Sequence, residues 1–201
     1  MTEQTVDTTT DDKTETSRGL GIFLALAGSI GLLSSAILII EKIKLLEDPA
    51  DALSCDINPF VSCGNVINTD QASAFGFPNP LIGVAGFAIV VTLGVLLVAG
   101  VKLPSFVQAG LWLGSLLGVG LVTWLQYQSI YDIESLCPYC MVVWSVTIPI
   151  FVLVSAWVLR TLHPGAALTR FVNNWSVLII VLWYVAIASA IWFQFGSDLW
   201  A

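Results

Sequence analysis

The chain has 201 residues, of which 57% are hydrophobic and only 10% are charged, and its mean hydropathy is +0.88. An ordinary soluble domain carries about 25% charged residues, so this composition excludes a soluble globular protein and indicates that lipid surrounds most of the chain. The formal net charge of −7 comes partly from an acidic N-terminal tail and gives no sign of binding to nucleic acid.

Five stretches of the sequence contain no Asp, Glu, Lys or Arg, and each is longer than the roughly 20 residues that cross a bilayer as a helix. A charge at mid-bilayer costs at least about 2.5 to 3.5 kcal/mol, so the charged residues between these stretches mark turns. We therefore predict an all-α integral membrane protein. Its five transmembrane helices should lie at about residues 19–40, 79–101, 105–127, 137–159 and 174–195.

The first 18 residues are rich in threonine and acidic side chains, and they are predicted to be a disordered tail before a single membrane domain at residues 19–197. They lack the basic start and the small-residue cleavage site of a signal peptide, so the first span should remain as an anchor. Basic residues are more frequent on the tail's side of the membrane than in the long loop at residues 41–78. The positive-inside rule then predicts a cytoplasmic N-terminus and an outer position for this loop.

All four cysteines fall on the outer side of this predicted topology. Cys55 and Cys63 lie in the long loop, while Cys137 and Cys140 begin the fourth span. In a bacterial inner membrane this side is oxidising, so disulfides form and persist there. Four cysteines allow three pairings, and the spacings favour Cys55 with Cys63 and Cys137 with Cys140 without proving either pair.

The C-x-x-C pair lies at the start of the fourth span, a position that favours thiol–disulfide exchange. A helix N-terminus stabilises a thiolate, which favours Cys137 as the sulfur that exchanges with other thiols. Cys140 lies nearly one turn deeper on the same helix face, closer to the hydrocarbon, where an apolar redox partner would arrive. The pattern therefore predicts a redox site at the membrane surface.

Less reactive roles are also compatible with the four cysteines. Cys137 and Cys140 could form a structural disulfide, although so short a loop contributes little stability through chain entropy. Cys55 and Cys63 could form a structural disulfide in the outer loop. The four thiols could hold zinc, but one pair has seven intervening residues and the oxidising side would compete for the thiols. We predict no metal site.

Three motifs occur in order along the chain: CDINPFVSC in the loop, FGFPNPLIG before the second span and CPYC at the start of the fourth. This combination resembles the vitamin K epoxide reductase family, specifically its bacterial disulfide-forming members, over residues 19–159. The resemblance implies a four-helix bundle around a quinone site, with the fifth helix peripheral. It also implies that Cys63 exchanges with a thioredoxin-fold partner, that Cys55 attacks Cys137 and that Cys140 faces the quinone.

Three further residues match positions of interest in this family. Asn79 matches an asparagine that hydrogen-bonds a quinone oxygen, but Asn79 followed by Pro80 is equally an ordinary helix start. Trp144 stands one turn after Cys140, where the animal enzymes carry tyrosine, and it could stack on a quinone ring or pack between helices. This departure argues against vitamin K epoxide as the natural substrate. Thr69 matches a loop Ser or Thr of the family and could instead shape a turn.

The expected function is that of a multi-pass thiol–disulfide oxidoreductase in a bacterial inner membrane. It would reoxidise a DsbA-like protein and pass the electrons to menaquinone or ubiquinone. Many bacterial relatives carry a thioredoxin-like domain after the fifth span, but only FGSDLWA follows here, so a separate partner is expected. The alternatives are a quinone epoxide reductase and a non-enzymatic membrane scaffold with structural disulfides.

Overall fold

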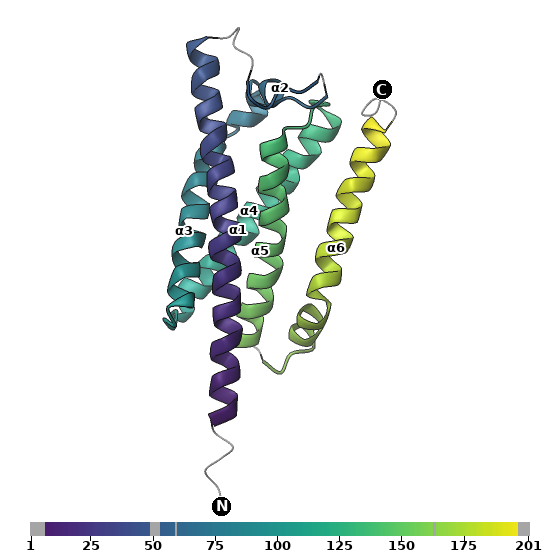
Figure 1. Cartoon of the computed structure of the whole chain (residues 1–201). Coiled ribbons are helices and arrows are strands. Elements are labelled where there is room, and N and C mark those ends of the chain that lie inside the picture. Colours follow the sequence, from purple (N-terminus) through teal and green to yellow (C-terminus); the bar gives the residue numbers. More distant parts are fainter. Residues whose placement is uncertain (1–6, 49–52, 59, 163, 197–201) are drawn as a thin grey trace, which may run out of the picture.

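The computed structural model describes residues 7–48, 53–58, 60–162 and 164–196, with side chains of the first helix from residue 17 onward. Helices account for most of this part of the chain (Figure 1). In order they are α1 (Asp7–Glu47), α2 (Cys63–Ile67), the 3-10 helix η1 (Asp70–Ser73), α3 (Pro80–Val98), α4 (Ser105–Tyr131), α5 (Pro138–Leu162) and α6 (Ala167–Phe195).

Five of these helices are long and apolar enough to cross a membrane. They are α1 from Ser17, α3, α4, α5 and α6, and each overlaps one of the predicted spans. The prediction of an all-helical protein with five spanning helices is confirmed, because runs free of charge must satisfy their backbone polar groups internally when lipid surrounds them.

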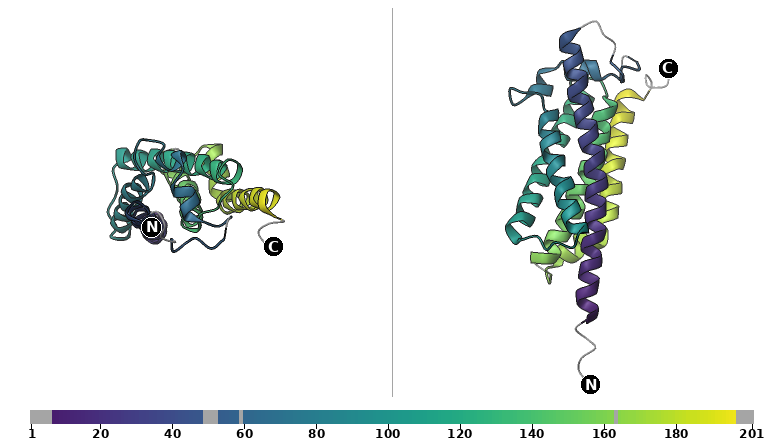
Figure 2. Two further views of the ribbon diagram at one scale, coloured as in Figure 1. Left: turned by 90° about the horizontal axis from the view of Figure 1, so that it is seen from above. Right: turned by 60° about the vertical axis from the view of Figure 1, so that its left-hand side comes forward.

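The helices α1, α3, α4 and α5 form a bundle, and α6 stands at its edge against α5 (Figures 1 and 2). A buried apolar cluster at the centre of the bundle combines side chains from all four helices, among them Leu24, Phe87, Leu111 and Val154. By contrast, none of the most apolar stretch of α6 is buried inside the protein. The predicted arrangement of four bundled helices and one peripheral helix is therefore confirmed.

Helices α1 and α3 pack unusually closely through glycine. A Cβ atom placed on Gly94 of α3 would lie 2.7 Å from the backbone nitrogen of Ala25 and 2.9 Å from the carbonyl oxygen of Gly21, both on α1. Neither contact leaves room for a side chain, so glycine is required for the two backbones to approach. Small residues serve this purpose in membrane helix pairs, where lipid provides no hydrophobic drive for association.

The N-terminal tail at residues 1–18 is predicted to be disordered, and α1 begins within it at Asp7. Disorder of the tail stays a prediction. Helix nucleation is costly but each added residue is cheap, so a long apolar span can extend its helix into the preceding polar segment. Residues 1–6 and the C-terminal residues 197–201 lie outside the described part of the chain.

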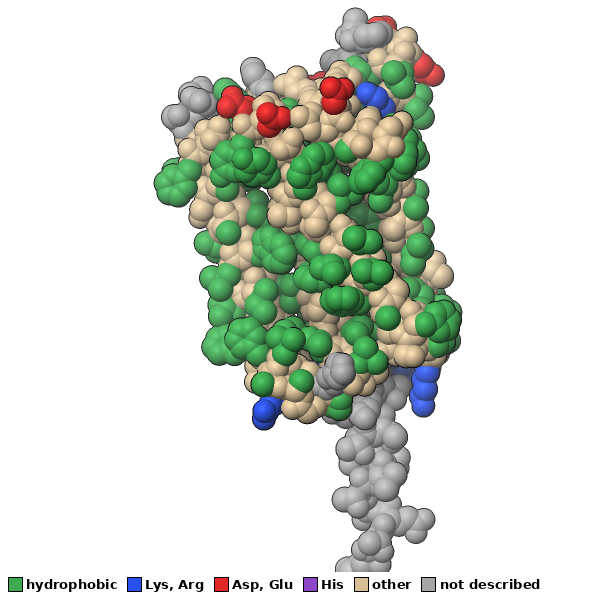
Figure 3. All heavy atoms as spheres, turned by 180° about the vertical axis from the view of Figure 1, so that it is seen from behind, with side chains coloured by type: hydrophobic (Ala, Val, Ile, Leu, Met, Phe, Trp, Pro, Cys, Tyr) green, Lys and Arg blue, Asp and Glu red, His purple; other side chains and the backbone are tan. Residues whose placement is uncertain are grey.

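Charged side chains separate towards the two ends of the helices, with an apolar belt between them (Figure 3). One end carries exposed Arg18, Lys102, Arg160 and Arg170, on or next to α1, α3, α5 and α6. The other end carries α2, η1 and the described loop segments that hold Cys55 and Cys63. This second end positions the four cysteines.

Candidate active site

The loop that carries Cys63 pairs through its backbone with the segment before α5. The N–H of Ser62 donates to the carbonyl oxygen of Leu136 at 3.0 Å, and the N–H of Leu136 donates to the carbonyl oxygen of Phe60 at 2.7 Å. Ser62 and Leu136 each directly precede a cysteine. The pairing therefore brings Cys63 of the loop next to Cys137 at the start of α5.

Three of the four cysteines meet at this point. Cys55 and Cys63 form a disulfide with their Cα atoms 5.6 Å apart, which confirms that predicted pair. The sulfur of Cys63 also lies 3.2 Å from the sulfur of Cys137. Cys137 and Cys140 are free thiols, so their predicted disulfide is not formed in this state. Because Cys55 and Cys63 are bonded to each other, they cannot supply thiolates to a zinc ion.

The contact between Cys63 and Cys137 differs from the order that the family resemblance implied, in which Cys55 attacks Cys137. Cys63 is the first residue of α2, and the Ser62–Leu136 pairing fixes that helix against the start of α5. The sulfur in contact with Cys137 therefore comes from the second loop cysteine. Which loop cysteine exchanges with Cys137 stays a prediction.

An aspartate next to Cys55 holds the start of α2. Asp56 Oδ1 accepts hydrogen bonds from Ser62 Oγ at 2.7 Å and from the N–H of Gly64 at 3.1 Å. A Cβ atom on Gly64 would lie 3.1 Å from the Asp56 carboxylate, so glycine permits this close approach. Burial raises the pKa of Asp56, but these hydrogen bonds outweigh it, and the pKa lies below its ordinary value.

Cys137 sits in surroundings that stabilise its thiolate. The hydrogen bond from the Cys140 thiol is the largest cause of a lowered pKa, and the backbone N–H groups of Cys140 and Tyr139 add to it. The N–H of Cys140 lies 3.4 Å from the Cys137 sulfur. Burial and the negative charge of Asp56 oppose the effect without cancelling it. These contacts agree with the predicted role of the helix N-terminus.

A cavity of about 1410 Å³ opens beside Cys140, within the bundle of α1, α3, α4 and α5. Its wall is mostly apolar, and its polar groups include Asn79 and Thr69. Ligand sites are commonly about 300 to 1,000 Å³, so this cavity has room for a ring system with a long apolar tail. Half-buried Cys140 is the cysteine that lines it.

Asn79 lies in the cavity wall with part of its amide unpaired. Its Nδ2 donates to the carbonyl oxygen of Gln71 at 2.7 Å, while its buried Oδ1 has no partner. Helix α3 does begin at Pro80, as the Asn–Pro sequence predicted, but the Asn79 side chain makes no capping hydrogen bond. A pure capping role is therefore wrong, and the unpaired oxygen points to a ligand, because buried polar atoms normally have partners.

Trp144 and Thr69 also line the cavity. Trp144 is buried and packs in an apolar cluster with Val122, Leu136 and Phe195, so it both fills space between helices and faces the cavity. Thr69 Oγ1 accepts from the N–H of Ala72 and donates to the carbonyl oxygen of Val66. The alternative that Thr69 shapes a turn is confirmed.

The model of the vitamin K epoxide reductase family matches residues 22–155, a range that contains all four cysteines, Asn79 and Trp144. The chain belongs to this family. Members of the vitamin K epoxide reductase family are oxidoreductases, and the site agrees in kind, with a disulfide, two free thiols and a cavity within a membrane bundle. No match was found among curated proteins. The matched range ends before α6, the peripheral helix.

The sequence did not predict the residues that hold the disulfide loop against the start of α5. Ser62 and Leu136 act through their backbones, which no side-chain motif reveals. Glu41 and Lys42, near the C-terminal end of α1, also contact the loop segments that carry the cysteines. The sequence did contain a signal for Glu41, because this acidic residue directly follows the charge-free stretch of the first span and so lies at the end of that span.

Proposed function

We propose that this protein is a quinone-dependent thiol–disulfide oxidoreductase of a bacterial inner membrane. It would reoxidise a separate DsbA-like protein on the outer face, with its own N-terminus in the cytoplasm. The observation that carries the proposal is the 3.2 Å contact between the sulfurs of Cys63 and Cys137. This contact joins the loop disulfide to a cysteine pair whose second member lines the cavity.

The first exchange takes place at the loop disulfide. A thiolate of the reduced partner attacks Cys55, forming a mixed disulfide and releasing Cys63 as a thiolate. The partner's second thiol then attacks its own sulfur in that bond, so the partner leaves oxidised and Cys55 is freed as a thiolate. The loop now holds both electrons as two thiols.

The second exchange moves these electrons to α5. The Cys63 thiolate attacks Cys137 of a Cys137–Cys140 disulfide, forming the Cys63–Cys137 bond and releasing Cys140 as a thiolate. Cys55 then attacks Cys63, which re-forms the loop disulfide and releases Cys137. In the proposal, this step ends with the loop disulfide formed and two free thiols on α5, and the observed Cys55–Cys63 disulfide and free Cys137 and Cys140 support it.

The cavity residues fit a quinone as the final electron acceptor. A bound quinone supplies a sink for two electrons and two protons, and the Cys137–Cys140 disulfide re-forms. Asn79 has one Nδ2 hydrogen that can donate to a quinone oxygen and an unpaired Oδ1 that can accept from a hydroquinone hydroxyl. The apolar wall, with Trp144, suits the ring and its tail.

The proposal is tested with purified protein in lipid nanodiscs, using short-chain menaquinone and ubiquinone analogues in separate arms. A reduced DsbA-like protein and dithiothreitol serve as alternative reductants, and quinone reduction is followed by its absorbance. Cys140→Ala should abolish turnover with both reductants. Cys63→Ala should abolish it only with the protein, because the small dithiol can reduce Cys137–Cys140 directly.

Full activity of Cys140→Ala would refute the proposed mechanism. A third arm supplies a quinone epoxide with dithiothreitol, and turnover there in preference to quinone reduction would instead support the epoxide reductase. If reduced partner protein leaves Cys55–Cys63 oxidised in the wild type, the disulfide is a structural one and the scaffold alternative holds.

A further inference from the structure

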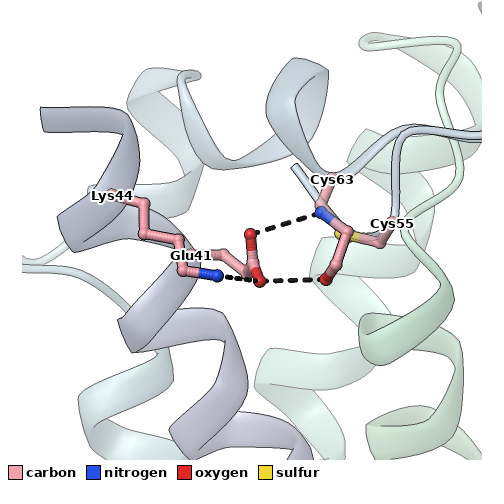
Figure 4. Close-up of polar contacts among 5 residues, drawn as sticks. Glu41, Lys44, Cys55 and Cys63 are labelled. Carbon is pink, nitrogen blue, oxygen red and sulfur yellow. Dashed lines mark hydrogen bonds and ion pairs between the residues drawn. A yellow bond between two sulfur atoms is a disulfide. The ribbon is translucent and has the colours of Figure 1, made fainter. Parts of the chain in front are cut away.

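A buried carboxylate on α1 binds the loop directly before the disulfide. Glu41 is 3% exposed. Its carboxylate accepts hydrogen bonds from Ser54 Oγ at 2.9 Å and from the Ser54 N–H at 3.4 Å, and it pairs with Lys44 Nζ at 3.2 Å (Figure 4). Ser54 is the residue before Cys55. Glu41 thus fixes the backbone next to the first loop cysteine.

The neighbouring residue of α1 holds the other arm of the loop. Lys42 Nζ donates to the carbonyl oxygen of Ile67 at 3.1 Å. Ile67 is the last residue of α2, the helix that begins with Cys63. Consecutive residues of α1 therefore hold the segments of both disulfide cysteines.

These contacts keep the loop disulfide packed against the bundle. Cys55 is 4% exposed and Cys63 is 0% exposed, in an apolar cluster that also contains Leu38, Ile67 and Cys137. A buried charge such as that of Glu41 is costly unless hydrogen bonds and a counter-ion compensate it. Lys44 on the same helix compensates part of this charge, and the Ser54 hydrogen bonds add their share only while the loop is docked.

We propose that Glu41 is a positioning residue that keeps Cys55 within reach of Cys63 while the loop disulfide is open. This inference rests on the proposed function. In the exchange, Cys63 is joined to Cys137, and the Cys55 thiolate must attack Cys63 so that the loop disulfide re-forms and Cys137 leaves as a thiolate. At that moment no disulfide joins Cys55 to Cys63. The Glu41–Ser54 hydrogen bonds supply the restraint.

The test compares Glu41→Ala with Glu41→Gln, Ser54→Ala and the control Glu47→Ala. Glutamine keeps an oxygen that can accept from Ser54, whereas alanine removes it. Glu47 is an exposed acid on the same helix. Turnover is measured with reduced DsbA-like protein and, separately, with dithiothreitol. Alkylation during turnover, followed by peptide mass analysis, gives the fraction of chains with a Cys63–Cys137 disulfide.

Glu41→Ala should lower turnover with the protein reductant by about tenfold or more, because two hydrogen bonds to a charged acceptor are lost. It should also accumulate the Cys63–Cys137 disulfide, since Cys55 no longer resolves it, and it should keep its turnover with dithiothreitol. Ser54→Ala should show the same pattern more weakly, Glu41→Gln should recover most of the activity, and Glu47→Ala should match the wild type.

The inference is overturned if Glu41→Ala and Ser54→Ala turn over the protein reductant normally and accumulate no Cys63–Cys137 disulfide. It is equally overturned if Glu41→Ala loses activity with dithiothreitol to the same extent, because the residue would then support the fold in general. A wild-type protein that reduces quinone with neither reductant would overturn the proposed function itself, and a wild-type control therefore separates the two failures.

Discussion

The sulfur of Cys63 lies 3.2 Å from the sulfur of Cys137, although 74 positions separate the two residues in the chain. One of these sulfurs belongs to a disulfide and the other to a free thiol. Exchange between them needs little movement, and it would pass electrons from the loop to the helix that borders the cavity. In the proposed mechanism, this contact gives the two loop cysteines different tasks.

Removing either loop cysteine should trap a different disulfide. Cys55→Ala should accumulate Cys63–Cys137, because the thiol that resolves this bond is missing. Cys63→Ala should instead form a mixed disulfide between Cys55 and the DsbA-like protein when the oxidised protein is supplied, because the Cys55 thiolate attacks the partner's disulfide and releases the partner's second cysteine as a thiolate. Non-reducing gels and peptide mass analysis after acid quenching identify both products. A partner protein trapped on Cys63 of the Cys55→Ala variant would support the opposite order of exchange.

The reactivity of Cys137 should depend on pH through its lowered pKa. The thiolate is the reactive form, so reactivity is present above this pKa and is lost as the pH falls through it. Two variants that keep Cys137 as the single cysteine isolate the cause of the lowered pKa. Both carry Cys55→Ala and Cys63→Ala. One adds Cys140→Ser and the other adds Cys140→Ala. The serine hydroxyl can still donate to the thiolate, so the pKa should be lower in the serine variant.

Titration of the ultraviolet absorbance of the thiolate measures this pKa in both single-cysteine proteins. Equal values would show that the side chain at position 140 does not stabilise the Cys137 thiolate. The lowered pKa would then come from the backbone N–H groups of Tyr139 and Cys140 alone.

Asn79→Ala should weaken binding of the quinone. A neutral hydrogen bond contributes about 0.5 to 1.5 kcal/mol, so the KM for the quinone should rise about two- to tenfold. The dithiothreitol assay measures this effect without the partner protein. Asn174→Ala, which removes an exposed amide from α6, is the matched control. An unchanged KM in Asn79→Ala would remove this residue from the quinone site.

Gly94→Ala should destabilise the bundle. The new methyl group would meet the backbone of α1 at Ala25 and Gly21, which cannot move aside as a side chain can. Overpacking of this kind costs about 1 to 3 kcal/mol. Gly86→Ala on the same helix is the control, since a Cβ atom there meets nothing within 4 Å. Thermal unfolding in detergent should give a lower midpoint for Gly94→Ala alone, and equal midpoints would contradict the packing argument.

Much of the fold follows from the sequence alone. The five spans could be predicted because a charge in a bilayer is so costly that charged residues occur between the spans and not within them. The pairing of Cys55 with Cys63 could be predicted from their short separation. The start of α1 at Asp7 could not be predicted, because whether a helix extends into the preceding polar segment depends on the span that follows and not on the composition of that segment.

Hydropathy and spacing are local properties, and they are enough to place four cysteines and Asn79 at one end of a five-helix membrane protein. The contact of Cys63 with Cys137 and the hold of Glu41 on Ser54 emerge only when the chain is folded. These contacts depend on backbone pairing at Leu136 and on the register of α1 against the loop. Both join segments distant in the chain, and no local pattern encodes which atoms meet.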